Sequence, residues 1–162
     1  MDSSPHILIR NAEKKDAPAI FELIQLLAEF ERAPHEVTNT VEDLFNDAFG
    51  QDPVCWTKIA EYDGEIVGMS LFYIRYSTWK GKTLYLEDII VKESYRGKGI
   101  GTKLFEETII EAKRRGLKAM NWQVLDWNTP AIDFYKAYDC ILDNEWINCK
   151  LTEQQIQSFE PK

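Results

Sequence analysis

The feature that most constrains the fold is a strand that leads through a glycine-rich turn into a helix. Residues Thr83–Val91 are rich in β-branched and aromatic side chains and predict the strand. The turn is Tyr95-Arg96-Gly97-Lys98-Gly99-Ile100-Gly101, and a helix is predicted over Gly99–Arg115, where Gly116 ends it. Such a unit needs a sheet to receive the strand and a helical layer to cover it.

The other elements alternate in the same manner. Asp63-Gly64 is a strong hairpin signal between the strands Trp56–Tyr62 and Ile66–Tyr76. Three further strands are predicted, at Ile7–Arg10, Ala119–Leu125 and Trp146–Leu151. The order predicts a fold of the α/β (α+β) type, a single domain over residues 1–162 with a mixed sheet and helices on both faces.

Helix ends are marked by local signals. Asp16 is predicted to cap a first helix that has Pro18 in its first turn. Thr40 and Asp43 form a predicted capping box for a second helix, which ends at Gly50. Two more helices are predicted, at Pro130–Ala137 with Asn128 or Thr129 as its cap, and at Glu153–Phe159.

Composition excludes several classes of protein. Hydrophobic residues make up 44% of the 162 residues, which suits one globular domain and argues against disorder. No apolar run reaches the ~20 residues that span a bilayer, and Met1–Pro5 shows no signal-peptide pattern. Three scattered cysteines and two histidines indicate neither a disulfide framework nor a metal site. We therefore expect a cytoplasmic protein that binds no metal and no membrane.

The net charge of −8 bears on partners. Nucleic-acid affinity comes mostly from neutralising phosphates, so nucleic acid is a poor partner for this chain. An acidic field favours a cationic substrate, although acidic charge also serves solubility alone.

The glycine cluster itself suggests phosphate binding. Glycines let the backbone approach a ligand closely, and the N–H groups at a helix N-terminus favour a pyrophosphate. Arg96 and Lys98 add positive charge there. The spacing fits neither a Walker A loop nor the G-x-G-x-x-G dinucleotide fingerprint, and an ordinary strand-to-helix turn stays an alternative.

Four segments together resemble the GNAT acetyltransferase superfamily. Arg96–Gly101 fits that family's R/Q-x-x-G-x-G/A acetyl-CoA loop. Leu84–Asp88, Trp127–Tyr135 and Leu27–Glu31 are similar to the spermidine/spermine (diamine) and the related thialysine acetyltransferases. The resemblance runs from Ile9 to about Leu151. It implies a mostly antiparallel GNAT-like sheet, transfer of acetyl from acetyl-CoA to a primary amine of a small cationic substrate, and a homodimer.

The resemblance also implies roles for individual residues. Those implied to bind acetyl-CoA are Ile89, Ile90, Val91, Arg96, Gly97, Lys98, Gly99, Ile100, Gly101, Thr102, Asn128, Thr129, Pro130 and Ala131. Those implied or proposed to contact the substrate are Phe30, Glu31, Glu87, Asp88, Asn121, Trp122 and Gln123. Tyr135 is implied to be the general acid. Ser77 stands where the spermidine/spermine enzymes have an acid, and the loop between Tyr135 and Trp146 is shorter, so thialysine, diamines and other short amines all remain candidate substrates.

Chemistry gives Glu87 and Tyr135 the same roles. An alkyl amine with a pKa near ~10.4 must lose a proton before it attacks a thioester, and Glu87 is the candidate base, acting directly or through water. Acids in an apolar strand need a reason, and the alternative for Glu87 and Asp88 is an acid pair at a strand bulge that binds backbone or a core arginine. Tyr135 is otherwise a core aromatic. The aromatic stretch Phe72–Trp79 is interpreted mainly as packing, with Trp79 kept as a candidate pocket or dimer residue.

Two other functions stay open at this point. One is acetylation of a protein lysine or N-terminus by the same fold. The other is a non-catalytic acetyl-CoA-binding regulatory module, against which the presence of Glu87 and Tyr135 argues.

Overall fold

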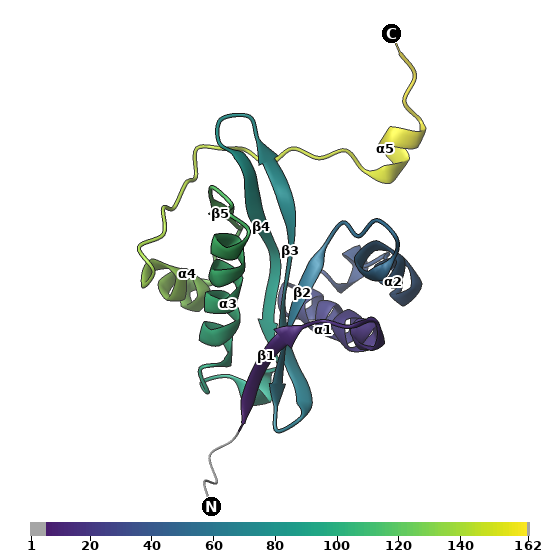
Figure 1. Cartoon of the computed structure of the whole chain (residues 1–162). Coiled ribbons are helices and arrows are strands. Elements are labelled where there is room, and N and C mark those ends of the chain that lie inside the picture. The colour runs from purple at the N-terminus through teal and green to yellow at the C-terminus, as the bar shows by residue number, and fades with distance from the viewer. Residues whose placement is uncertain (1–5, 162) are drawn as a thin grey trace, which may run out of the picture. The chain divides into compact units, whose positions relative to one another are not determined.

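The computed structural model describes residues 6–161, in two compact units that divide after Gln123. The N-terminal residues Met1–Pro5, in which the sequence shows no signal-peptide pattern, lie outside the described residues. The N-terminal unit contains the sheet and three α-helices, and the C-terminal unit contains two short helices (Figure 1). None of the helices within residues 6–161 is long and apolar enough to cross a membrane.

The sheet of the N-terminal unit is mixed and mostly antiparallel. Its five strands follow the chain order, and only the last pair, β4 and β5, is parallel. The strands are β1 (Ile7–Asn11), β2 (Trp56–Tyr62), β3 (Glu65–Ser77), β4 (Gly81–Val91) and β5 (Met120–Asn121). The predicted fold class is confirmed.

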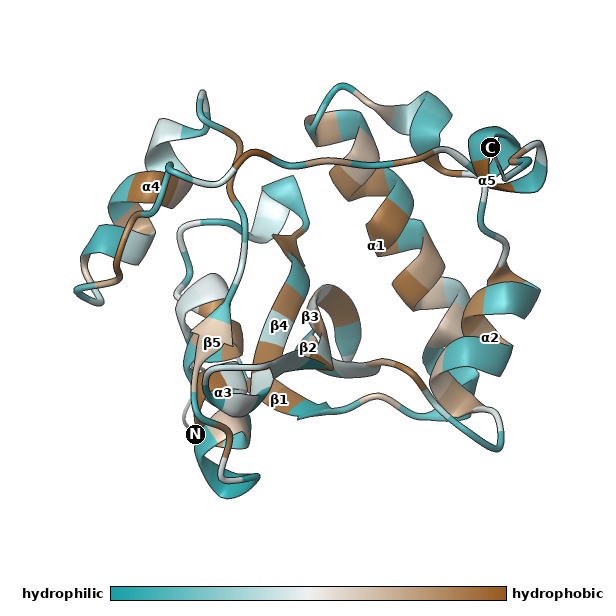
Figure 2. Ribbon diagram, turned by 90° about the horizontal axis from the view of Figure 1, so that it is seen from above, coloured by the Kyte–Doolittle hydropathy of each residue, from teal (hydrophilic) through white to brown (hydrophobic). Residues whose placement is uncertain are grey.

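Helices cover both faces of this sheet, as Figure 2 shows. On one face, α1 (Ala17–Phe30) and α2 (Val41–Phe49) enclose a core that includes Ile20, Leu44, Ile59 and Leu71. On the other face, α3 (Ile100–Arg114) packs Ile100 and Leu104 against Ala60 and Val67. The unit also has 3-10 turns at Lys14–Asp16, Pro34–Glu36 and Glu93–Tyr95.

Local turn signals predicted several boundaries correctly. Asp63 (φ 49°) and Gly64 (φ 86°) both have the positive φ that a type I′ hairpin turn requires. The Thr40 hydroxyl accepts a hydrogen bond from the Asp43 amide at 3.1 Å, and the Asp43 carboxylate accepts from the Thr40 amide at 3.2 Å. The capping box of α2 is therefore confirmed.

Asp16 precedes α1 as predicted, but its side chain does not cap that helix. Its buried carboxylate accepts two hydrogen bonds from the Arg10 guanidinium, at 2.7 and 3.0 Å, and one from the Glu13 amide at 2.7 Å. A bidentate charged pair is stronger than a neutral cap hydrogen bond, so the carboxylate turns toward β1 instead.

The predicted strand Ala119–Leu125 is much shorter in the structure. β5 pairs with β4 only at Leu84–Met120 and Tyr85–Asn121. Beyond Tyr85, β4 contains a bulge at Glu87, and a bulge bends and twists its strand. The two strands therefore separate after two residues.

The C-terminal unit contains α4 (Thr129–Lys136) and α5 (Glu153–Gln157). The Asn128 side-chain oxygen accepts from the Ala131 amide at 3.4 Å, which identifies Asn128 as the cap of α4. The predicted strand Trp146–Leu151 is wrong, because this segment has no regular structure. A strand needs a neighbour to pair with, and Ile147 is 89% exposed here.

Candidate active site

The bulge in β4 is centred on Glu87. In the register of β3 with β4, Leu71 lies opposite Asp88 and Phe72 lies opposite Leu86, so Glu87 is the additional residue. Leu71 belongs to the core beneath α1 and α2, which places Asp88 on that face of the sheet. The strand bulge is therefore present at this acid pair, and bulges often serve to aim side chains at active sites.

A third acid joins the pair from the end of α1. Glu31 follows the last residue of that helix. Burial, and then the nearby charges of Glu87 and Glu31, raise the pKa of Asp88 to about 7. Burial and the charge of Glu87 also raise the pKa of Glu31. Three predicted substrate residues thus gather in one acidic cluster, which favours a cation.

The raised pKa of Asp88 makes protein stability depend on pH. Because the folded pKa lies above the unfolded value, Asp88 stabilises the fold when it is protonated, and this contribution is lost as pH rises from about 4 to about 7. We expect Asp88→Asn to raise the melting temperature at pH 8 relative to the wild type, and to change it little at pH 4. The control Asp52→Asn removes an exposed acid. Equal shifts for the two variants at pH 8 would contradict the burial of Asp88.

Two tyrosines beside the acids were not predicted as site residues. The rings of Tyr73 and Tyr85 stack with centroids 5.2 Å apart, and the two residues are opposite one another in β3 and β4. The pKa of Tyr73 is raised by burial and by the charge of Glu87, to which it also hydrogen-bonds. The sequence pattern indicated only a half-buried strand, since their pairing depends on a register that the bulge shifts. Trp79 is 84% exposed in the turn between these strands.

The free edge of β4 follows the bulge. Within residues 6–161, β5 pairs with only two residues of β4, so the edge from Leu86 to Val91 has no neighbouring strand on that side. Ile89, Ile90 and Val91 lie along this edge. Unpaired backbone groups at such an edge can hydrogen-bond to a linear ligand that contains amides.

The glycine-rich turn lies just beyond that edge. Gly97 (φ 74°) and Gly99 (φ 78°) have left-handed backbones, and a Cβ at either position would meet no other atom within 4 Å. Gly99 precedes α3 without any side-chain cap, and the first turn of that helix holds no acid. The amides of Ile100, Gly101 and Thr102 are therefore available to an anion.

Basic side chains frame this turn. The Arg96 Nε donates to the carbonyl of Val91 at 3.2 Å, and its guanidinium lies 5.1 Å from the centre of the Phe30 ring. The Lys98 amino group lies 5.5 Å from the centre of the Tyr62 ring. Phe30, predicted to contact substrate, is thus beside the glycine-rich turn. The open turn, the uncapped helix and the two cations fit a pyrophosphate with an extended arm along β4.

The predicted substrate residues Asn121, Trp122 and Gln123 lie in β5 or directly after it. Asn121 pairs with Tyr85, on the face that carries the acidic cluster. Trp122 packs edge-to-face on Phe105 of α3, with ring centroids 5.3 Å apart, on the opposite face. Gln123 is exposed at the end of the unit. The geometry therefore supports a substrate contact for Asn121 more than for Trp122.

The remaining predicted residues belong to the C-terminal unit. Asn128, Thr129, Pro130 and Ala131 form the cap and first turn of α4. Tyr135 is on the same helix and is only 6% exposed. Burial, and then the nearby Cys140, raise its pKa to about 12, so its hydroxyl keeps its proton at neutral pH.

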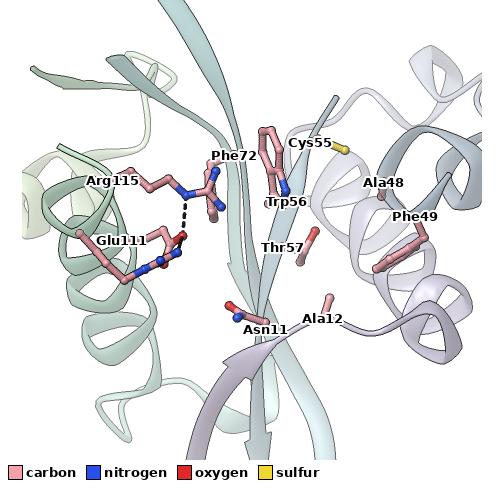
Figure 3. A pocket seen from close by; sticks show the side chains of 11 residues that line it. Asn11, Ala12, Ala48, Phe49, Cys55, Trp56, Thr57, Phe72, Glu111 and Arg115 are labelled. Carbon is pink, nitrogen blue, oxygen red and sulfur yellow. Dashed lines mark hydrogen bonds and ion pairs between the residues drawn. The ribbon is translucent and has the colours of Figure 1, made fainter. Parts of the chain in front are cut away.

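A separate pocket of about 180 Å³ lies at the junction of α2, β1, β2 and α3 (Figure 3). There, Glu111 accepts from Arg115 at 2.6 Å and from Lys58 at 3.2 Å, and the Arg115 guanidinium lies 4.7 Å from the Trp56 ring centre. The pocket contains none of the predicted site residues. It is distinct from the acidic cluster and the glycine-rich turn.

Comparison with known proteins identifies the family of this chain. Residues 19–139 match the acetyltransferase (GNAT) family model. This chain is a member of the GNAT family. Its free β4 edge and glycine-rich turn therefore belong to an acetyltransferase that uses acetyl-CoA.

Relatives of known activity agree with this assignment. The chain is 42% identical to the thialysine N-epsilon-acetyltransferase of Bos taurus, over 81% of this chain and 82% of that protein. It is 39% identical to the Mus musculus protein of the same name, over 93% and 95%. It is 34% identical to the Homo sapiens spermidine/spermine N(1)-acetyltransferase-like protein 1, over 95% of this chain but 24% of that longer protein. The GNAT protein is thus an N-acetyltransferase that acts on an amine.

Solved structures support the fold. An aminoglycoside acetyltransferase from an uncultured soil metagenomic sample, crystallised with trehalose, superposes with a TM-score of 0.75 at 20% identity, covering 90% of this chain and 95% of that one. An aminoglycoside N-acetyltransferase in complex with CoA gives a TM-score of 0.74 at 19% identity, covering 93% and 98%.

A charge placed in the glycine-rich turn tests its role in binding CoA. Gly99→Asp puts a carboxylate where the pyrophosphate is expected, and we expect calorimetry to show CoA affinity at least ~10-fold weaker, since one like-charge contact costs more than about 1.4 kcal/mol in such a site. The matched control is Gly81→Asp, because Gly81 (φ 88°) has the same backbone strain in the β3–β4 turn. A folded Gly99→Asp variant that binds CoA as tightly as Gly81→Asp would exclude this role.

Proposed function

We propose that this GNAT protein transfers the acetyl group of acetyl-CoA to the terminal primary amine of a small cationic substrate, such as a diamine, a polyamine or a thialysine-like amino acid. The observation that carries the proposal is the acidic cluster of Glu31, Glu87 and Asp88 at the bulge of β4. The pKa values of Asp88 and Glu31 are raised by burial and by the charges of the neighbouring acids, so an ammonium group that enters the cluster stabilises their ionised forms.

The relatives support the same class of substrate. Their names specify thialysine and, for the human relative, spermidine and spermine. A further relative, from Arabidopsis thaliana and 32% identical, is an L-ornithine N5-acetyltransferase. All of these substrates carry a primary amine on a flexible aliphatic chain and are cationic at neutral pH.

Glu87 is the proposed base. A substrate ammonium with a pKa near ~10.4 must lose its proton before attack, and Glu87 accepts that proton, through a water molecule. Its position as the extra residue of the bulge leaves its side chain exposed at the acidic cluster, where solvent can carry the proton away. Asp88 and Glu31 hold the amine, and Asn121 lies on the same face.

The glycine-rich turn and the β4 edge hold the donor in this proposal. Bound acetyl-CoA supplies the acetyl thioester. The amides of Ile100, Gly101 and Thr102 and the cations of Arg96 and Lys98 hold its pyrophosphate. The backbone of Ile89, Ile90 and Val91 orients its extended arm, and the first turn of α4, from Asn128 to Ala131, adds a second contact.

Tyr135, predicted as the general acid, is proposed to donate a hydrogen bond to the leaving sulfur. Its pKa of about 12 keeps the phenol protonated throughout the working range of pH. A free thiol has a pKa near ~8.5, so full proton transfer to a thiolate is unfavourable. Tyr135 therefore acts mainly by hydrogen-bonding to the sulfur while the carbon–sulfur bond breaks, when charge builds up on that atom.

A homodimer in the cytoplasm completes the proposal. Large apolar side chains are exposed in the C-terminal unit, among them Ile141, Trp146, Ile147, Leu151 and Phe159. Several large apolar side chains exposed within one short segment favour an interaction surface. A second subunit would cover it. An enzyme that acetylates a protein is the competing function, and the acidic cluster favours a small cation over a peptide.

A panel of amines tests the proposal. The purified enzyme is assayed with acetyl-CoA and thialysine, lysine, ornithine, putrescine, spermidine, tyramine and a lysine-containing peptide, with thiol release as the signal. We expect kcat/KM to be highest for aliphatic cationic amines. If the peptide or tyramine has the highest value, the acidic cluster does not select the substrate.

A further inference from the structure

Along one face of the β3–β4 hairpin, the side chains change from acidic to aromatic to basic. Successive pairs on this face are Leu71 with Asp88, Tyr73 with Tyr85, and Arg75 with Thr83. Since a strand rises about 3.3 Å per residue, neighbouring pairs are about 7 Å apart. Acids, stacked aromatic rings and a guanidinium thus follow one another along a single face.

Arg75 lies back over the tyrosines. Its guanidinium carbon is 5.8 Å from the centre of the Tyr85 ring. The Thr83 hydroxyl donates to the carbonyl of Arg75 at 3.1 Å, and buried Thr83 thereby fixes the backbone at this point. Arg75 itself is exposed, and no ion pair in the part of the chain that the structure describes includes it.

The pKa values of Tyr73 and Tyr85 respond to the charges at both ends of this series. The charge of Glu87 raises the pKa of Tyr73 and of Tyr85, and the charge of Arg75 lowers both. The aromatic pair is therefore within reach of an anion at one end and a cation at the other. A substrate lying across the rings would meet carboxylates at its amine end and a guanidinium at its other end.

We propose that this face selects a dipolar substrate, an amino acid with a lysine-like side chain, and that Arg75 binds its α-carboxylate. The inference rests on the proposed function, because it takes Glu31, Glu87 and Asp88 as the site of the reacting amine. An extended lysine side chain separates its amine from its carboxylate by ~7 Å, as bond lengths of about 1.5 Å imply. Along the strands Asp88 and Arg75 are two steps apart, but the Arg75 guanidinium lies back over the Tyr85 ring at the intermediate step, so the substrate length corresponds to the one step that remains between the acids and the guanidinium.

The same arrangement disfavours diamines and polyamines. Their second ammonium group would lie where Arg75 is, and like charges in contact repel. Arg75 therefore contributes to specificity in two ways, by attracting a carboxylate and by repelling a cation. Arg75 is a specificity residue and takes no part in proton transfer.

Pairs of substrates that differ only in the α-carboxylate measure its contribution to kcat/KM. L-Lysine and cadaverine differ only by the carboxylate, as do L-ornithine and putrescine. We expect the wild type to prefer each amino acid to its diamine in kcat/KM. A hydrogen bond to a charged group is worth about 1.5–3 kcal/mol, so Arg75→Ala should lower kcat/KM for the amino acids about 10- to 100-fold, through KM. The same variant should raise kcat/KM for the diamines.

Two further variants complete the test. Arg75→Lys keeps the charge and should retain part of the preference for amino acids. Lys82→Ala removes a cation from a neighbouring pair on the opposite face of the hairpin, where Lys82 lies opposite Tyr76, and should leave the preference unchanged. If Arg75→Ala changes kcat/KM for amino acid and diamine by the same factor, Arg75 does not bind the α-carboxylate of the substrate. If the wild type acetylates neither series and also fails to acetylate thialysine and spermidine, the proposed function itself fails, and this inference with it.

Discussion

Replacing Glu87 with glutamine is expected to lower kcat/KM for a small amine by about 10²–10⁴-fold, the usual cost of losing a general base. Glutamine keeps the shape of the side chain and removes its ability to accept a proton. The bulge depends on the register of β3 and β4, and Glu87 is exposed, so the variant should fold normally. Steady-state assays across pH measure the loss.

The pH profile separates a base from a simple electrostatic contact. Without Glu87, the amine must lose its proton in solution, so activity of Glu87→Gln should increase steadily toward pH 10, near the amine's own pKa of ~10.4. The control Glu42→Gln removes an exposed acid from the first turn of α2 and should behave as the wild type. A Glu87→Gln enzyme within about threefold of the wild type at every pH would show that another group, or bulk water, takes the proton.

Tyr135→Phe is expected to lower kcat by about 10²–10³-fold, the usual cost of losing one hydrogen-bond donor to charge that develops in the transition state, while the affinity for CoA stays nearly constant. The ring stays in place, so its packing is kept, including the edge-to-face contact with Phe134 at 5.4 Å between centroids. Only the hydroxyl is lost. Because it acts mainly on the departing sulfur, the loss belongs to kcat at saturating amine.

Tyr138→Phe is the matched control, since Tyr138 also contacts Phe134 in the C-terminal unit, at 5.5 Å. Melting temperatures of both variants show whether the fold is kept. The pKa of about 12 adds a second expectation, that the wild-type profile of kcat shows no loss of a Tyr135 proton below about pH 11. A Tyr135→Phe enzyme that turns over within about twofold of the wild type would indicate a core aromatic and an unaided leaving group.

Local signals predicted much of the fold, because hairpins and helix ends depend on nearby residues. Asp63-Gly64 specified its turn through two positive φ angles, and Thr40 capped α2 through a residue three positions away. Asp16 does not cap α1 because its carboxylate accepts hydrogen bonds from Arg10 of β1. The strand at Trp146–Leu151 failed since strand formation depends on a partner, which a propensity pattern does not supply.

The residues of the candidate site also fall into two groups: those recognisable from nearby sequence, and those brought together only by the pairing of strands. Glu87 and Asp88 stood out as acids inside an apolar strand, and the bulge explains why the strand tolerates them. Gly97 and Gly99 were visible from their type and spacing, because the turn needs left-handed residues. Tyr73, Tyr85 and Arg75 were not visible as a group, since the bulge shifts the register that places them together on one face.

A competition experiment tests most directly the claim that this GNAT enzyme acetylates a small cationic amine. Thialysine, spermidine and a lysine-containing peptide are mixed at equal concentration with limiting acetyl-CoA, and mass spectrometry measures the ratio of acetylated products. That ratio equals the ratio of kcat/KM values. The account predicts that the acetylated small amines, thialysine foremost, exceed the acetylated peptide by at least ~10-fold, about 1.4 kcal/mol in transition-state binding. A mixture in which the peptide carries most of the acetyl groups would contradict it.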